Sequence, residues 1–153
     1  MMSLCCDVLS LLQGKTLVTA ESITGGGIGA ALTAVSGSSA VYKGGIISYT
    51  NEVKHAVLGV PMEVLNTCGA VSAPVAKAMA GGAKRVVGAD VAVAVTGLAG
   101  PDGDEFGNPV GTVFIGYADD HTAFAREYHF SGDRAQVREQ TIEAALALIL
   151  EMN

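Results

Sequence analysis

Residues 19–35 read TAESITGGGIGAALTAV, and this stretch joins the end of a strand to a glycine turn and the start of a helix. The apolar run that leads into it, KTLVTAE, is typical of a buried strand. Three glycines then permit a tight turn, and small residues follow at helical spacing from residue 25 to 35. A strand that leads through a short turn into a helix predicts an α/β fold.

The turn itself carries polar residues that have two alternative roles. A serine between a strand and a helix, here Ser22, can act as a nucleophile, as in the elbow of hydrolases. The same backbone can instead bind an anion through free N–H groups at the start of a helix. The residues alone leave both roles open for Ser22 and for its neighbours Thr24, Gly25 and Gly26.

The rest of the chain alternates helical and strand patterns. DVAVAVTG (90–97) is the clearest strand, and its nearly continuous Val and Ala predict a strand covered on both faces. Further strands are predicted at 44–50 and, as an antiparallel hairpin, at 110–118 and 121–130. Helices are predicted at 4–12, from 51, at 61–69, at 72–88 and from 131 to the end. We therefore expect a single three-layer α/β/α domain over residues 1–153, with a mixed sheet covered by helices on both faces.

Composition excludes several classes of protein. The chain has 153 residues, of which 50% are hydrophobic and 16% are charged, a balance that favours a packed domain over disorder. A formal net charge of −6 argues against general nucleic-acid binding. Residues 1–15 lack the basic start of a signal peptide, and no stretch reaches membrane-spanning length. The spacing of the three cysteines matches neither a disulfide framework nor a metal-binding motif, so we expect a cytoplasmic protein with reduced thiols.

The pattern of ionisable residues favours a serine paired with a lysine over a metal site. The three histidines lie in unrelated contexts, and the acidic residues of 102–105 lack the spacing of a calcium loop, so we expect no metal and no cofactor. A lysine whose pKa is lowered by burial can deprotonate a serine. Lys54 follows the strand 44–50 and could meet Ser22 or Ser39, whereas a solvated surface lysine is the alternative.

Two further positions could contact a ligand. Ser131 or Asp133 can cap the last helix, which would place its first N–H groups beside Arg134 as an anion site. Thr96 and Gly97 end the buried strand, where a hydroxyl and a close backbone approach could face a ligand. An ordinary helix cap and an ordinary strand end are the alternatives at these two places.

Six ordered motifs together resemble the C-terminal domain of the CinA family of competence/damage-inducible proteins. They cover the chain from about residue 18 to the final helix and read TAESITGG, GSSAVYKGGIISYTNEVKHAVLGV, GAVSAPVAKAMAGGA, AVTGLAGPDGD, NPVGTVFIGYA and SGDRAQVR. The family includes amidohydrolases that convert nicotinamide mononucleotide (NMN) to nicotinate mononucleotide and ammonia. Larger members carry an additional N-terminal domain, so the resemblance implies that this chain corresponds to the C-terminal domain.

The resemblance also implies roles for particular residues. It implies a metal-independent Ser–Lys dyad, in which Ser39 of GSSA is the nucleophile, with the adjacent Ser38 or Ser22 as alternatives, and Lys54 is the base. Tyr49 matches a further catalytic residue. The implied substrate-binding residues are Ser22, Thr24, Gly25, Gly26, Thr96, Gly97 and Arg134.

The expected partner is therefore a small molecule, NMN, and neither nucleic acid nor membrane. A homodimer is expected as well, since small apolar-rich α/β enzymes often associate. Two other functions remain open from the sequence. One is a non-catalytic nucleotide-binding or protein-interaction module connected with competence or DNA damage. The other, a phosphatase or nucleotidase, would normally need a metal or an acidic nucleophile.

Overall fold

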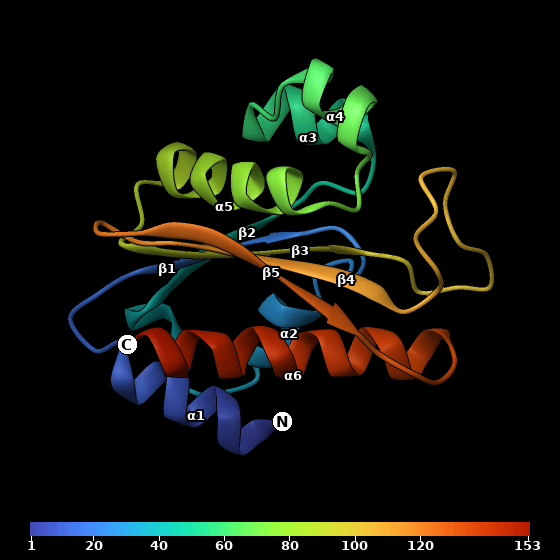
Figure 1. Ribbon diagram of the computed structural model, residues 1–153. Coiled ribbons are helices and arrows are strands. Elements are labelled where there is room, and N and C mark those ends of the chain that lie inside the picture. The colour runs from blue at the N-terminus through green and yellow to red at the C-terminus, as the bar shows by residue number, and fades with distance from the viewer.

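The protein, described over all 153 residues by a computed structural model, has a five-stranded sheet between two layers of helices (Figure 1). The strand order is β2-β1-β3-β4-β5. β1 pairs in parallel with β2 and with β3, whereas the β3–β4 and β4–β5 pairs are antiparallel. The strands are β1 Leu17–Glu21, β2 Tyr42–Ile47, β3 Val91–Gly97, β4 Thr112–Ala118 and β5 Ala123–His129. The expected three-layer α/β/α domain with a mixed sheet is confirmed.

Helices cover both faces of the sheet, as Figure 1 shows. One face carries α5, with α3 and α4 beside it, and the other face carries α1, α2 and α6. The helices are α1 Met2–Leu11, α2 Gly27–Thr33, α3 Asn51–Leu58, α4 Met62–Cys68, α5 Ala73–Val87 and α6 Arg134–Met152, with a 3-10 helix, η1 Ser38–Ala40, before β2. No helix is both long enough and apolar enough to cross a membrane.

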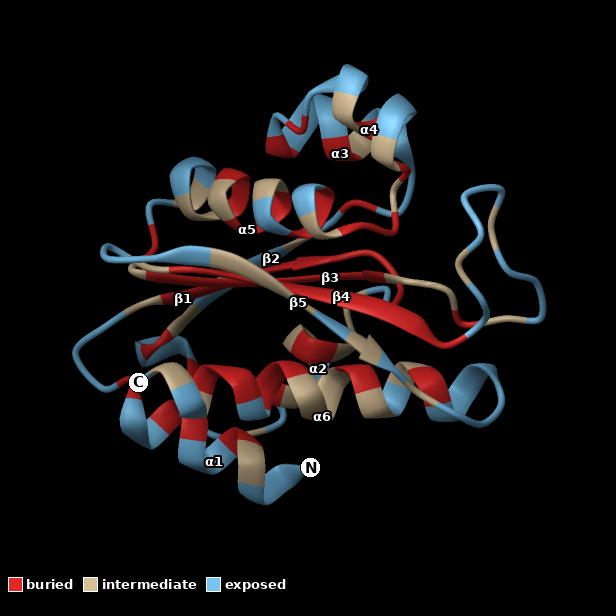
Figure 2. Ribbon diagram, viewed as in Figure 1, coloured by how far each residue is buried: buried red, intermediate tan, exposed pale blue.

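Two large apolar cores, one on each side of the sheet, hold the layers together, and a small third cluster joins Val71, Ala76 and Phe114. All seven residues of β4 and six of the seven of β3 are buried, which explains their almost unbroken apolar sequence (Figure 2). The contact between α5 and β4 is unusually close, because a Cβ on Gly116 would collide with the carbonyl oxygen of Ala76. Gly82 has the same role inside α5, where a Cβ would meet the carbonyl oxygen of Leu58. These glycines therefore permit close packing, and α5 continues through residues 81 and 82.

The observed boundaries differ from the expected ones mainly around β2. This strand begins at Tyr42 and ends at Ile47, so residues 48–50 form the turn into α3 instead of the end of a strand. Thr50 is the N-cap of α3, since its hydroxyl accepts a hydrogen bond from the Val53 N–H at 3.3 Å. The last helix is capped by Asp133, one of the two expected candidates, in a capping box with Gln136.

The topology places four chain segments at one edge of the sheet. The carboxyl ends of the parallel strands β1, β2 and β3 lie there, and so does the carboxyl end of β5, which is antiparallel to β4. The loop between β3 and β4 extends from this edge, on the right of Figure 1, and α6 starts beside it. Open α/β sheets bind ligands at the carboxyl ends of their strands.

Candidate active site

A cavity of about 300 Å³ opens at this edge of the sheet. Its walls come from the turn after β1, the turn after β2, the start of α3, the α4–α5 connection, the loop after β3 and the start of α6. The lining residues are Ser22, Ile23, Tyr49, Lys54, Ala70, Val71, Thr96, Gly97, Leu98, Ala99, Gly100, Asp102 and Arg134.

A buried lysine lies at the bottom of this cavity, in contact with a serine. The Lys54 Nζ is 2.9 Å from the Ser22 Oγ, and it also lies 2.7 Å from the Ser48 carbonyl oxygen and 3.2 Å from that of Tyr49. The side chain of Lys54 is only 1% exposed, and no carboxylate lies within salt-bridge distance of it. The three contacts are all oxygens, so the amine has no negative partner in its surroundings.

The local fold explains how this lysine becomes buried. Lys54 lies in the first turn of α3, which Thr50 caps. Because Cα–Cβ bonds in a helix tilt toward its N-terminus, the side chain runs back toward the end of β2. There the turn presents the carbonyl groups of Ser48 and Tyr49. Since β1 and β2 are neighbours, Ser22 at the end of β1 lies next to this turn.

Burial makes the amine of Lys54 a stronger candidate for a base. Desolvation lowers the pKa of Lys54 from its usual 10.5 to about 8. In its neutral form the amine can donate to the two carbonyl oxygens and accept the Ser22 hydroxyl proton through its lone pair. The geometry therefore suits proton transfer from Ser22 to Lys54.

The mouth of the cavity carries an exposed arginine and an exposed tyrosine. Arg134 donates to the Gly100 carbonyl oxygen at 2.7 Å and to the Tyr49 phenol oxygen at 3.3 Å. Arg134 forms no ion pair with Asp or Glu, so its charge is free to meet an anion. Together these contacts connect the turn after β2, the loop after β3 and the start of α6.

The end of β3 forms another wall. Thr96 is 1% exposed, and its hydroxyl donates to the Ala70 carbonyl oxygen at 2.9 Å, which fixes the α4–α5 connection against the sheet. Gly97 also lines the cavity, and a Cβ there would collide with the Thr112 carbonyl oxygen and with Val113. Gly97 therefore permits the close packing of β3 against β4, and its approach to a ligand stays a prediction.

The other residues of the glycine turn shape the cavity without lining it. Thr24 is buried, and its hydroxyl donates to the Glu21 carboxylate at 2.7 Å. Gly25 and Gly26 have φ values of +59° and +102°, a region that favours glycine, so they let the chain turn from β1 into α2. Of the four expected residues of this turn, only Ser22 reaches the cavity.

Ser39 does not meet Lys54, contrary to the expected pairing. It lies in η1, before the amino end of β2, and is exposed. β2 runs parallel to β1, so Ser39 is at the opposite edge of the sheet from Ser22, roughly 16 Å away for a five-residue strand. Ser38 is buried but belongs to the same 3-10 helix. The serine beside Lys54 is therefore Ser22.

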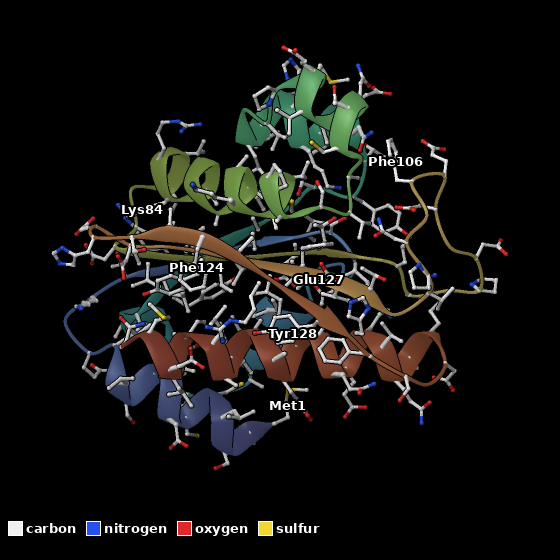
Figure 3. The ribbon with its side chains drawn as sticks, viewed as in Figure 1. Met1, Lys84, Phe106, Phe124, Glu127 and Tyr128 are labelled. Carbon is white, nitrogen blue, oxygen red and sulfur yellow. The ribbon has the colours of Figure 1, made fainter.

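Several residues of the site were not expected from the sequence. Asp102, one of the acidic residues that lack the spacing of a calcium loop, lines the cavity. The loop that carries it folds back on itself through Asp104 and Asn108, and Phe106 lies on the side facing α4, where a Cβ on Gly69 would meet its ring (Figure 3). Nothing in the local sequence marks the contact of Phe106 with Gly69, since it joins residues 37 positions apart.

No three or more His, Cys, Asp or Glu side chains come together in an arrangement that could hold a metal ion. The three cysteines are free thiols. His121 and His129 are exposed and do not line the cavity, whereas the His55 ring contacts the Val60 carbonyl oxygen at 2.8 Å.

Comparison with known families identifies the domain. The sequence profile of the family described as CinA C-terminal domain matches residues 3–153. The chain belongs to the CinA C-terminal domain family. This agrees with the six motifs noted above and accounts for nearly the whole chain.

Curated relatives of this CinA-family chain are longer proteins. A CinA-like protein of Geobacter metallireducens is 51% identical over 135 residues, which cover 88% of this chain and 32% of that protein. A CinA-like protein of Parasynechococcus marenigrum is 49% identical over 148 residues, covering 94% of this chain and 35% of its own length. The chain thus spans about a third of the curated relatives it matches.

Solved structures of the same superfamily share the complete fold. The competence damage-inducible protein A (ComA) of Klebsiella pneumoniae matches with a TM-score of 0.95 at 37% identity, over 98% of this chain and 94% of that chain. The competence/damage inducible protein CihA of Agrobacterium tumefaciens matches with a TM-score of 0.95 at 38% identity, over 99% and 94% of the two chains. The α/β architecture derived above is therefore that of the CinA superfamily.

Proposed function

We propose that this domain hydrolyses the carboxamide of NMN to nicotinate mononucleotide and ammonia, without a metal, through Ser22 and Lys54. The observation that carries the proposal is the 2.9 Å contact between the Ser22 Oγ and the Lys54 Nζ at the bottom of the cavity. Amide hydrolysis by a serine needs a base at this distance, and a lysine of lowered pKa supplies one. The family's amidohydrolase members give the substrate class.

The reaction divides into acylation and deacylation. Neutral Lys54 takes the proton of Ser22 while the Ser22 Oγ bonds to the carboxamide carbon, and the C=O electron pair moves to its oxygen. The protonated Lys54 then gives its proton to the amide nitrogen as the C–N bond breaks and ammonia leaves. In the second half, neutral Lys54 takes a proton from water as the water oxygen bonds to the acyl carbon. Lys54 then returns this proton to the Ser22 Oγ as the ester C–O bond breaks, which releases nicotinate mononucleotide and restores Ser22. Lys54 therefore serves as base and acid in each half.

The mouth of the cavity suits the charged parts of NMN. The free guanidinium of Arg134 can donate a bidentate pair of hydrogen bonds to the phosphate. The pyridinium ring withdraws electrons from the carboxamide and so makes its carbon a better electrophile. Tyr49 at the mouth and Thr96 at the end of β3 also line the cavity, and in this proposal they position the nucleotide.

The test is ammonia and nicotinate mononucleotide production by the purified protein in the presence of a chelator. Turnover of NMN that continues after removal of metals is the expected result. If the folded protein binds NMN without turnover, the non-catalytic binding module replaces this proposal. A cytoplasmic setting and a homodimer belong to the same proposal, and size-exclusion chromatography with light scattering tests the dimer.

A further inference from the structure

Acyl transfer to a serine needs hydrogen-bond donors for the oxygen that becomes negative, and two buried residues of the turn after β1 offer unused ones. The backbone N–H groups of Ile23 and Thr24 have no acceptor within the protein, although both residues are nearly buried. The neighbouring N–H of Ser22 donates to the Val95 carbonyl oxygen at 3.1 Å, and that of Gly25 donates to the Ser22 carbonyl oxygen at 3.1 Å. Buried backbone donors are rarely left without partners.

The position of these donors fits an oxyanion. Ile23 directly follows the serine that contacts Lys54, and it lines the cavity. In the elbow of α/β-hydrolases, the N–H of the residue after the nucleophile binds the oxyanion. A substrate carbon bonded to the Ser22 Oγ places its oxygen next to this same turn.

One side chain from the far end of the sequence fixes the orientation of the turn. Arg138 of α6 donates from its Nε to the Ile23 carbonyl oxygen at 3.1 Å and from its Nη2 to the Thr24 carbonyl oxygen at 3.1 Å. The Ile23 carbonyl and the Thr24 N–H belong to one planar trans peptide, so they point in opposite directions. The carbonyl points to Arg138, and α6 covers the face of the sheet opposite to α3 and α5 (Figure 1). The Thr24 N–H therefore points away from α6, toward the side from which Lys54 enters.

Arg138 differs from the other site arginine in burial and partners. Its side chain is half-buried, it contacts neither a carboxylate nor the cavity, and both of its hydrogen bonds go to this turn. A cation bonded to two carbonyl oxygens polarises their peptides and makes the N–H groups stronger donors. Its charge also lies on the side of the turn away from the substrate, where it favours a nearby oxyanion.

We propose that the Ile23 and Thr24 N–H groups form the oxyanion hole of this site and that Arg138 is the positioning residue that aligns them. The inference rests on the proposed function for its substrate, but the donors and their alignment apply to any acylation of Ser22. When the Ser22 Oγ bonds to the carbonyl carbon, the displaced electron pair on the substrate oxygen meets these two N–H groups. The two N–H groups keep their protons and only donate hydrogen bonds, while the Ser22 proton passes to Lys54.

The experiment compares Arg138→Ala, Arg138→Lys and the control Arg126→Ala, with NMN and with p-nitrophenyl acetate as an independent acyl donor. Arg126 is a suitable control because it bonds to the Glu151 carboxylate on the surface and does not line the cavity. We expect Arg138→Ala to lower kcat for NMN about 100-fold, with KM changed only slightly, because the lost interaction acts in the transition state. Acylation by p-nitrophenyl acetate should fall in parallel.

Chemical rescue by guanidinium distinguishes a positioning role of Arg138 from a merely structural one. Millimolar guanidinium should restore part of the kcat of Arg138→Ala and nothing in Arg126→Ala, and Arg138→Lys should retain an intermediate kcat. A rise in KM at unchanged kcat, or activity of Arg138→Ala within about two-fold of wild type, would overturn the proposal, as would a loss that guanidinium leaves unchanged in a folded variant.

With two acyl donors, the proposal that NMN is the substrate and the proposal of the oxyanion hole can be tested separately. If wild type acylates with p-nitrophenyl acetate but leaves NMN intact, the NMN proposal fails, and the ester data alone decide on Arg138. If wild type reacts with neither donor, both proposals are overturned.

Discussion

The Lys54 amine lies 2.9 Å from the Ser22 hydroxyl although 32 residues separate the two in the sequence. The contact exists because β1 and β2 are parallel neighbours whose carboxyl ends lead into the turn of Ser22 and into α3. The amine is buried without a carboxylate partner, and this combination lowers its pKa to about 8. Both the chemistry and the pH response of the domain depend on this pair.

The rate of NMN hydrolysis should follow the protonation of Lys54. Because the pKa of Lys54 is about 8, only the minority neutral form acts as base at pH 7. We expect kcat/KM to rise about tenfold per pH unit below the pKa and to level off above it. Initial rates of ammonia release between pH 6 and 9.5 measure this profile. Lys54→Arg should be inactive throughout, since an arginine stays protonated; a profile that is flat across this range would contradict the role of Lys54.

The same pKa shift predicts that the stability of the protein rises with pH. Between about pH 8 and 10.5 the unfolded chain binds the Lys54 proton while the folded protein does not. The free energy of unfolding therefore increases through this window, and it is lowest where the buried amine is charged, below pH 8. Urea denaturation of wild type and Lys54→Met from pH 7 to 9.5 isolates this effect, because only wild type should show this rise. Parallel pH curves for the two proteins would show that the Lys54 pKa is not shifted.

Arg134 should act on the phosphate of the substrate and not on its amide. A charge-assisted hydrogen bond contributes about 1.5–3 kcal/mol, so Arg134→Ala should raise KM for NMN about 10- to 100-fold. The matched comparison substrate is nicotinamide riboside, which has no phosphate, so Arg134→Ala should change its KM only slightly. Steady-state kinetics with both substrates, and with Arg126→Ala as control, provide the measurement. Equal increases in KM for both substrates would instead indicate that Arg134 maintains the structure of the cavity mouth.

Glu21 should stabilise the turn that carries Ser22. Its carboxylate is 1% exposed and accepts from the Thr24 hydroxyl and from the N–H groups of Ile28 and Gly29, at 2.7 to 3.0 Å. Glu21→Ala leaves these donors unsatisfied, so the free energy of unfolding should fall by between about 2 and 4 kcal/mol. Glu139→Ala, on the exposed side of α6, should change it by less than about 0.5 kcal/mol. Equilibrium urea unfolding compares the two; similar values would contradict a structural role for Glu21.

The sequence predicted the fold better than it predicted the pairing within the site. Periodicity marks β3 and the capped α6 unambiguously, because burial on both faces and a capping box leave local signals. Lys54 and Thr96 were singled out at strand ends, Arg134 at the start of the last helix and Tyr49 by the family resemblance, and all four line the cavity. The pairing of Lys54 with Ser22 depends on strand order, which no local pattern contains, and the motif resemblance pointed to Ser39 instead.

Glu21 and Arg138 illustrate a second reason why the site could not be predicted in full from the sequence. Glu21 accepts from backbone N–H groups at the start of α2, and Arg138 donates to backbone carbonyl groups of the turn that carries Ser22. Backbone contacts of this kind have no residue-type signature in the partner segment. Only the packing of α2 and α6 beneath the sheet brings Arg138 to a turn more than 110 residues earlier in the chain.

The central claim is that Ser22, and not Ser39, is the nucleophile. The most direct measurement is the rate of ammonia release from NMN by Ser22→Ala and Ser39→Ala, with mass spectrometry of wild-type protein quenched during turnover to locate the acyl group. The account predicts that Ser22→Ala loses activity by a factor of at least about 10³ and that Ser39→Ala retains it, with the acyl group on the peptide that contains Ser22. An active Ser22→Ala together with an inactive, folded Ser39→Ala would contradict it.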